Sequence, residues 1–304
     1  MAVSDYQASF NGLTFGAGTQ WPFIEIVGLE EFAVRNTDTP APTLWGLFPG
    51  VDYASERVIT MTVLFIGDPS LVYQFEAAFL PSSTALLPFV YKLPGREEMT
   101  VSARCRRRSR PVSKDSQYGL LEFVVELDAP DPRRYSNALQ QSQVSPFVSG
   151  SAGLKMTVGA GTGLGFLMNV GAGTGLGLKM TSIAAFGAQA LSNNGNVDTY
   201  PTFVFTNVGT GMSSWTVIND TTGISATFNQ TVQVGDTFTV TMGAVATPTS
   251  GLPVNFNGVS RYGTWQVPRL PLSLAPGVNS LRYIVNSGDA GNARCLATWR
   301  NAYL

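Results

Sequence analysis

The sequence predicts a mostly β protein of two domains: strands around one helix in the first, followed by a β-sandwich or jelly roll. Charged residues make up only 13% of the 304 residues, while 32 glycines and 18 prolines provide for many turns. This composition is typical of turn-rich β structure and not of disorder or a coiled coil. Short runs rich in β-branched and aromatic residues recur along the chain, and one helical pattern interrupts them.

The first half contains two expected strands, at residues 22–30 (PFIEIVGLE) and 57–67 (RVITMTVLFIG). Both runs are rich in the β-branched and apolar residues that strands favour. In the second run, alternate residues are apolar and share one face, as the two-residue period of a strand requires. These residues are Ile59, Met61, Val63 and Phe65.

A helix is expected directly after the second strand. Asp68 is a good N-cap residue, and Pro69 suits the first helical position because its missing N–H has no partner there. Apolar residues then recur at helical spacing until Pro81 ends the run. They are Leu71, Val72, Phe75, Ala78 and Phe79.

Residues 98–110 and 118–132 predict a long β-hairpin whose first arm is rich in arginine. A two-residue period places four arginines on one strand face: Arg104, Arg106, Arg108 and Arg110. Such a basic run is compatible with nucleic-acid binding. However, residues 1–150 carry 12 Lys and Arg against 16 Asp and Glu, a balance of −4, and no aromatic residues are interleaved. An exposed strand face, a subunit interface or the wall of a channel is therefore favoured over a nucleic-acid site.

The second half is expected to be all β. Its short strand-like runs, such as YPTFVFTN and NSLRYIVNSG, alternate with turn clusters, a spacing typical of a sandwich or jelly roll. Between the halves, residues 136–150 lose periodicity and contain many Pro, Ser, Gln and Asn residues. We therefore predict one domain at residues 1–140 and a second at residues 141–304.

A glycine-rich repeat lies near the start of the second domain. The heptad GAGTGLG occurs at residues 159–165 and again at 171–177. Neither copy has the glycine spacing of a dinucleotide-binding loop, and no Gly-Lys-Ser/Thr follows. The repeat within residues 151–182 instead predicts two tandem β-hairpins with glycines at the turns.

Composition also argues against several functions. The chain has no histidine, which removes the commonest general base and metal ligand. Its two cysteines, Cys105 and Cys295, form no disulfide framework. No apolar run is long enough to span a membrane, and no signal peptide is recognised. We therefore expect no enzyme activity, no cofactor, no metal and no membrane association.

The order of several short motifs resembles the distal tail protein (Dit) family of long, flexible-tailed bacteriophages. In the first half these motifs are FNGLTFGAGTQWPFIEIVGLE, ERVITMTVLFIGD and LDAPDPRRYS. In the second half they are SNNGNVDTYPTFVFTN, INDTTGISATFNQTVQVGDTFTV, LPLSLAPGVNSLRYIV and ATWRNAYL. The repeat at 151–182 departs from the family pattern.

This resemblance implies a tail-tube-like first domain, which is a β-barrel or sandwich with one helix, and a galectin-like second domain, which is a β-sandwich of the jelly-roll type. It also implies a homohexameric ring that joins the tail tube to the hub at the tail tip. DNA would pass through the lumen without specific binding. The protein would be part of the virion, assembled in the host cytoplasm. An alternative is a virion carbohydrate-binding module that contacts host glycans through its second domain. Trp215, Trp265 and Trp299 would then be stacking candidates, although we favour placing them in a core or interface.

Overall fold

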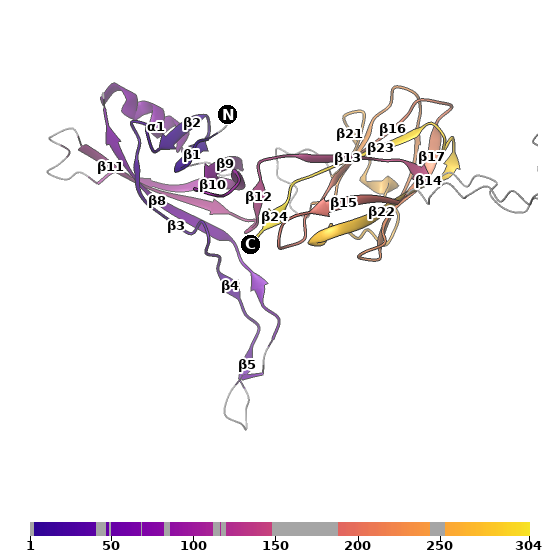
Figure 1. Ribbon diagram of the computed structural model, residues 1–304, viewed down its shortest axis with the longest axis horizontal. Coiled ribbons are helices and arrows are strands. Elements are labelled where there is room, and N and C mark those ends of the chain that lie inside the picture. Colours follow the sequence, from indigo (N-terminus) through magenta and orange to yellow (C-terminus); the bar gives the residue numbers. More distant parts are fainter. Residues whose placement is uncertain are drawn as a thin grey trace, which may run out of the picture.

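Two β bodies lie side by side in the structure, a computed structural model, and a narrow ribbon of strands projects from the first of them (Figure 1). The structure describes residues 3–40, 47–48, 50–67, 69–81, 86–111, 116, 120–147, 188–243 and 253–304. Each body has its own hydrophobic core among these residues. We call the body around the first core the first unit and the other the second unit. The mostly β fold predicted from the sequence is confirmed.

The first unit is built on one curled sheet with the strand order β2-β1-β9-β10-β11-β8-β3. Its strands are β1 Gln7–Phe10, β2 Leu13–Gly16, β3 Phe23–Val27, β8 Arg57–Ile66, β9 Leu87–Lys92, β10 Met99–Ser109 and β11 Leu120–Ala129. The longest ladder joins β8 and β11, from Leu120 opposite Ile66 to Ala129 opposite Arg57. This ladder contains the predicted apolar face, because Ile59, Met61, Val63 and Phe65 are all fully buried.

The single α-helix in the described residues covers one face of this sheet. A 3-10 turn, η1 Pro69–Leu71, precedes α1 Val72–Ala78, so the α-helix is shorter than the spacing predicted. The proposed cap Asp68 lies outside the described residues. Phe75 is fully buried and stacks on Trp21, with ring centroids 4.9 Å apart, and Phe79 packs beside it at 4.6 Å. This aromatic cluster attaches the helix to the sheet, since buried aromatic pairs contribute about 0.5–1.5 kcal/mol beyond their area.

The second unit is a sandwich of two sheets that share one core. The first sheet has the order β13-β23-β16-β19-β20-β21, and the second β14-β22-β17-β18, with β15 also paired to β22. The strands of the first are β13 Gln140–Val144, β16 Thr202–Asn207, β19 Phe238–Thr241, β20 Val254–Phe256, β21 Val259–Ser260 and β23 Ala293–Trp299. Those of the second are β14 Pro146–Phe147, β15 Ala188–Asn193, β17 Met212–Asn219, β18 Ile224–Val232 and β22 Gly277–Gly288. A 3-10 turn, η3 Tyr262–Thr264, packs beside β18.

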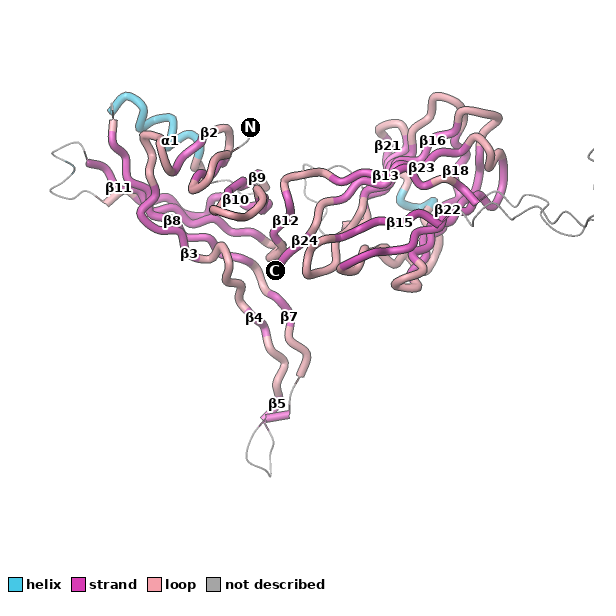
Figure 2. Tube along the Cα trace, in the orientation of Figure 1, coloured by secondary structure: helices cyan, strands magenta, loops and turns pink. Residues whose placement is uncertain are grey.

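The end of the chain returns from the second unit to the first. Strand β24 Ala302–Tyr303 pairs with β12 Arg134–Ser136, which in turn pairs with β10. Figure 2 shows β12 and β24 side by side between the two bodies. The sheet of the first unit therefore contains both the first described strand, β1, and the last, β24.

Two sequence predictions stay open. The glycine-rich repeat at 151–182 lies outside the described residues. The division at residues 140 and 141 remains a prediction, although the two cores fall on either side of it: the first contains residues from Ala8 to Ala129, and the second from Val144 to Trp299.

Candidate assembly interfaces

The ribbon that projects from the first unit is a two-stranded arm between β3 and β8. Its described ladders pair β4 Val34–Arg35 with β7 Tyr53–Ala54, and β5 Thr39–Pro40 with β6 Leu47–Phe48. Figures 1 and 2 show the arm extending away from both bodies. Thr37 joins its two sides: the Thr37 hydroxyl donates to the Val51 carbonyl at 3.1 Å and accepts the Val51 N–H at 2.9 Å.

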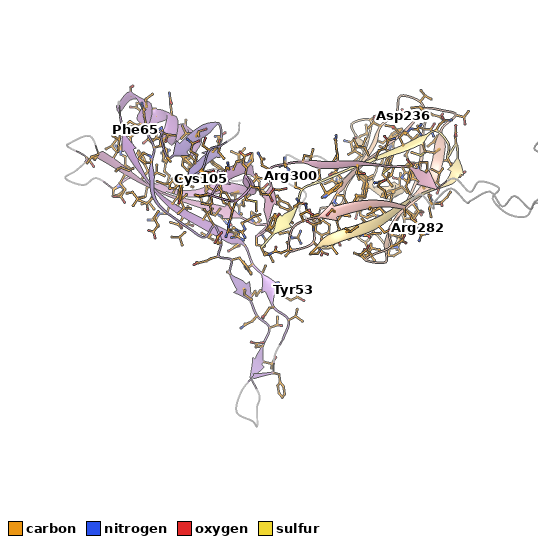
Figure 3. All side chains as sticks on the ribbon, viewed as in Figure 1. Tyr53, Phe65, Cys105, Asp236, Arg282 and Arg300 are labelled. Carbon is orange, nitrogen blue, oxygen red and sulfur yellow. The ribbon has the colours of Figure 1, made fainter. Side chains whose placement is uncertain are left out.

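The arm exposes apolar side chains that its own contacts do not cover. Val34, Phe48, Val51 and Tyr53 are 54%, 55%, 59% and 49% exposed. Figure 3 shows Tyr53 at the edge of the ribbon, where Arg35 lies 5.6 Å from its ring centroid. A two-stranded ribbon is at best marginally stable alone in water. Exposed apolar residues that gather on one projecting element are a candidate surface for another protein chain.

A buried arginine fixes the base of the arm. Arg57 is fully buried, and its Nη1 donates to three carbonyls of the turn after β3: Gly28 at 3.0 Å, Leu29 at 2.8 Å and Glu31 at 2.7 Å. Its Nε donates to the Pro132 carbonyl at 2.8 Å. Burial, followed by repulsion from Arg134, lowers the pKa of the Arg57 guanidinium from its ordinary value. The hydrogen bonds of Arg57 thus tie the turn at the base of the arm to the start of β8.

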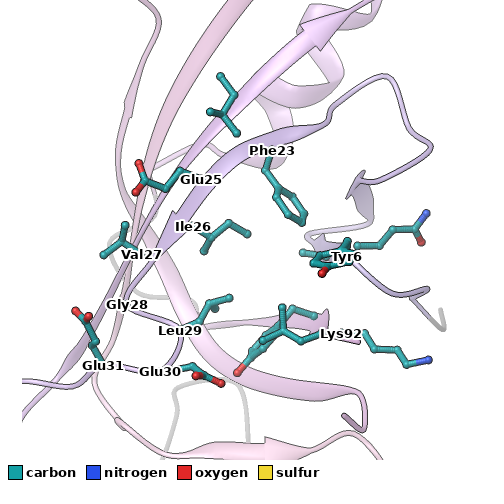
Figure 4. Close-up of a pocket in the computed structure, with 15 residues that line it drawn as sticks. Tyr6, Phe23, Glu25, Ile26, Val27, Gly28, Leu29, Glu30, Glu31 and Lys92 are labelled. Atoms are coloured by element: carbon teal, nitrogen blue, oxygen red, sulfur yellow. The ribbon is translucent and has the colours of Figure 1, made fainter. Parts of the chain in front are cut away.

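A groove of about 460 Å³ lies beside the base of the arm, between β3 on one side and β1 and β9 on the other. Phe23, Ile26 and Leu29 point into this groove, whereas Glu25 and Glu31 point away from it (Figure 4). A register shift between Phe23 and Glu25 accounts for the change in alternation. β3 pairs with β8 along one edge, and no described strand pairs with the other edge.

The four arginines predicted to share one strand face do not share it, and the cause is a β-bulge. The register of β10 against β11 shifts between Cys105 and Arg107, so Arg106 is the additional residue. A bulge reverses the alternation of the residues that follow it. Arg104 therefore lies opposite Asp128 on the outer face, while Arg108 lies opposite the buried Val125 on the helix side.

The ion pairs of these arginines follow the same division. Arg104 and Arg106 both contact the Asp128 carboxylate at 3.0 Å. Arg108 donates from Nη1 to the Glu76 carbonyl of α1, and Arg110 lies 3.8 Å from the Glu76 carboxylate. Asp128 is almost fully buried, whereas the side chains of Arg106 and Arg110 are about half exposed. One carboxylate thus serves two guanidinium groups, which leaves an excess of positive charge at this end of β10.

The two units meet at a polar junction around β12 and β24. Arg134 donates to the Leu304 carbonyl at 2.8 Å, and Tyr303 donates its hydroxyl to Glu97 at 2.8 Å. Arg300, labelled in Figure 3, donates to the Ser136 carbonyl at 3.0 Å and also to Asn137. These contacts fix one unit against the other.

The three candidate stacking tryptophans of the second unit belong to its core. Trp215, Trp265 and Trp299 are buried, and Trp215 packs edge-on against Phe238 with ring centroids 5.1 Å apart. They therefore present no exposed ring on which a sugar could stack, and the core interpretation of these residues is correct. Within the described ranges, no group of three or more Cys, Asp or Glu side chains is placed to hold a metal ion. No helix among those residues is long and apolar enough to cross a membrane.

Solved structures of two phages share this architecture over almost the whole chain. The SPP1 Dit (gp 19.1) protein, described as a paradigm of the hub adsorption apparatus in phages that infect Gram-positive bacteria, aligns with a TM-score of 0.62. That alignment has 11% identity and covers 98% of this chain and 99% of the other. The chain has a Dit-like fold.

Chains of the phage P2 baseplate in its activated conformation show the same likeness. The form with Ca aligns with a TM-score of 0.54 at 11% identity, covering 96% of this chain and 97% of the other. The form with Sr aligns with a TM-score of 0.54 at 11% identity, covering 98% of each chain. No protein-family model and no curated protein matches the sequence.

The arm is the feature that the sequence analysis missed. Its strands have only two residues each, and β4 and β7 are exposed on both faces, so no two-residue period can be recognised. A usable signal was the length of the connection between the expected strands at 22–30 and 57–67. Connections of that length without a helix are uncommon in compact domains and are usually functional.

Proposed function

We propose that this protein is a structural component of a phage tail tip, in which six copies form a ring that joins the tail tube to the hub. The Dit-like fold over almost the whole chain supports a place in such an assembly. In this proposal the protein has no catalytic role. It belongs to the virion and is assembled in the host cytoplasm, with residues 1–140 as the ring-forming domain and residues 141–304 as the galectin-like domain.

The observation that carries the proposal is the exposed arm. A ring requires a heterologous contact, in which one surface of each copy meets a different surface of the next. The arm gives the first unit one such surface, because it extends beyond the body that it belongs to and exposes Val34, Phe48, Val51 and Tyr53. In a ring, a neighbouring copy or another tail protein covers these side chains.

The charge of the first half fits a channel for DNA. A balance of −4 over residues 1–150 gives passing phosphates little to bind, since each Lys or Arg contact with a phosphate adds affinity. Arg104 and Arg106 share Asp128, and Arg108 and Arg110 contact Glu76. We therefore assign the arginine run to a contact between subunits in preference to the lumen.

Native mass spectrometry of the purified chain tests the ring, and electron microscopy of isolated tails tests its place. We expect a six-copy species and a ring at the tail tip. A variant lacking residues 36–51, joined by a short Gly-Asn turn, should keep its fold by circular dichroism but lose the six-copy species. The matched control replaces Val259 with Ser, an exposed apolar residue of the second unit, and should assemble normally. A wild-type chain that stays monomeric and is absent from tail tips contradicts the proposal.

A further inference from the structure

Two sheet edges of opposite charge lie on the first unit. The first, the acidic edge, consists of Ile24, Glu25, Val27 and Glu31, on β3 and the turn after it. All four side chains are exposed. β3 pairs with β8 alone among the described strands, so its other edge presents unpaired backbone groups beside the groove. Such an edge is a template for pairing with another chain.

The second, the basic edge, is the end of β10 from Arg104 to Arg110. β9 pairs with β10 only from Met99 to Ala103, whereas β11 pairs with it from Arg104 to Ser109. Beyond Ala103, β10 therefore has β11 on one side and, as far as the structure describes the chain, no strand on the other. The half-exposed side chains of Arg106 and Arg110 lie along this stretch.

Charge decides which of the possible edge pairings is allowed. Two basic edges repel each other, as do two acidic edges, so a symmetric contact of one edge with its own copy is disfavoured. An acidic edge facing a basic edge is attractive, and this arrangement is head-to-tail. The exposed Ile24 and Val27 add apolar area to the contact, and the adjoining groove of about 460 Å³ has room for incoming side chains.

We propose that the acidic edge of one copy docks against the basic edge of the next, with Glu25 and Glu31 facing Arg106 and Arg110. This contact rests on the proposed ring, and the acidic and basic edges are the two surfaces that meet between neighbouring copies. Because each copy has one edge of each sign, each copy accepts one neighbour on each side. Charge complementarity then disfavours face-to-face dimers and favours the head-to-tail order that a ring requires.

Paired charge reversals test the contact. The acidic-edge variant carries Glu25→Arg and Glu31→Arg, and the basic-edge variant carries Arg106→Glu and Arg110→Glu. We expect each variant alone to self-associate at least about 100-fold more weakly than the wild type, because opposed like charges at an interface are strongly unfavourable. Arg104 remains on Asp128 in the basic-edge variant, so that carboxylate stays paired. The control Arg261→Glu changes an exposed residue of the second unit and should leave assembly unchanged.

Mixing the two variants gives the decisive result. In a mixture, every edge of one variant is opposite in charge to every edge of the other, so alternating copies should form the ring again. Native mass spectrometry should then detect a hexamer with three copies of each variant. A chain carrying all four reversals should also form rings alone. If wild-type rings form and both variants still form rings alone, this contact is wrong while the proposed function stands. A monomeric wild type overturns both.

A cysteine pair provides a second measurement that does not depend on reversed charges. Glu25→Cys and Arg110→Cys in one chain should give disulfide-linked oligomers under mild oxidation, because the two native cysteines are buried and free. Each single cysteine variant should give no ladder of linked copies. A double variant that forms rings but no cross-linked ladder overturns the proposed contact.

Discussion

Replacing Arg57 with Met should destabilise the first unit and loosen the base of the arm. The substitution removes four donated hydrogen bonds, to the carbonyls of Gly28, Leu29, Glu31 and Pro132. Leu29 is buried, whereas Glu31 is exposed and water can replace its lost donor. An unsatisfied buried carbonyl costs about 1–3 kcal/mol, and Met avoids the cost of burying a charge. The expected net loss is therefore about 3 kcal/mol of the free energy of unfolding.

This loss is measurable in two independent ways. Thermal unfolding should shift downward by about 6–12 °C, at about 2–4 °C for each kcal/mol in a protein of this size. Limited proteolysis should cut residues 31–56 faster than in the wild type, because the turn at 28–31 loses its anchor. The matched control, Arg35→Met, removes an exposed arginine of the arm that lies over Tyr53, and should cost at most about 0.5 kcal/mol. A loss below about 1 kcal/mol together with unchanged cleavage refutes the reasoning.

Further predictions concern the junction and the second core. Gly195→Ala should destabilise the protein by at least about 2 kcal/mol in urea unfolding, since a Cβ there would lie 1.8 Å from the Ala302 carbonyl oxygen; Gly223→Ala, at a positive φ of 72° but with open space around it, should cost less. Burial, then the hydrogen bond to Glu97, raises the pKa of Tyr303 to about 12 from 10. The stability that this shift contributes is complete below pH 10 and is lost as pH rises to about 12. Tyr303→Phe should remove that part of the alkaline loss, measured as the unfolding midpoint against pH. Trp215→Ala should cost about 3–5 kcal/mol, because the indole is fully buried among aromatic rings; a cost below about 1 kcal/mol would be inconsistent with that packing.

The strands with a clean two-residue period were predictable from the sequence, because one face of each is buried. Ile59, Met61, Val63 and Phe65 alternate with residues that are half-buried or exposed, and Thr60 and Thr62 make this contrast visible in the middle of the strand. The short helix was also predictable, because Val72, Phe75 and Ala78 recur at helical spacing. In both cases one side of the element is buried, so apolar residues recur in the sequence at the period of that element.

The bulge in β10 was not predictable, and the reason is chemical. Arg106, Arg107 and Arg108 are identical residues, so the sequence holds no polar and apolar contrast from which a change of face could be read. A register shift in such a run therefore cannot be recognised from the residue types. The assignment of all four arginines to one face failed for this reason.

The contact between β12 and β24 was equally hidden, since it joins residues about 170 positions apart, as in the bond from Arg134 to Leu304. Its backbone bonds carry no residue preference strong enough to identify the partner strand. The candidate interfaces were only partly predictable. The arginine run drew attention by composition, whereas the arm and the acidic edge depend on exposure, which only the structure supplies.

The pairing of β24 with β12 has a consequence for the order of events during synthesis. The ribosome completes the first half of the chain long before residues 302–303 emerge, and domains generally fold as they appear. Until then, β12 has no β24 beside it, and Arg134 lacks its Leu304 partner. A chain released before its last residues therefore carries an unfinished junction between its units. The junction between the two units is therefore completed only after the residues of both cores have been synthesised.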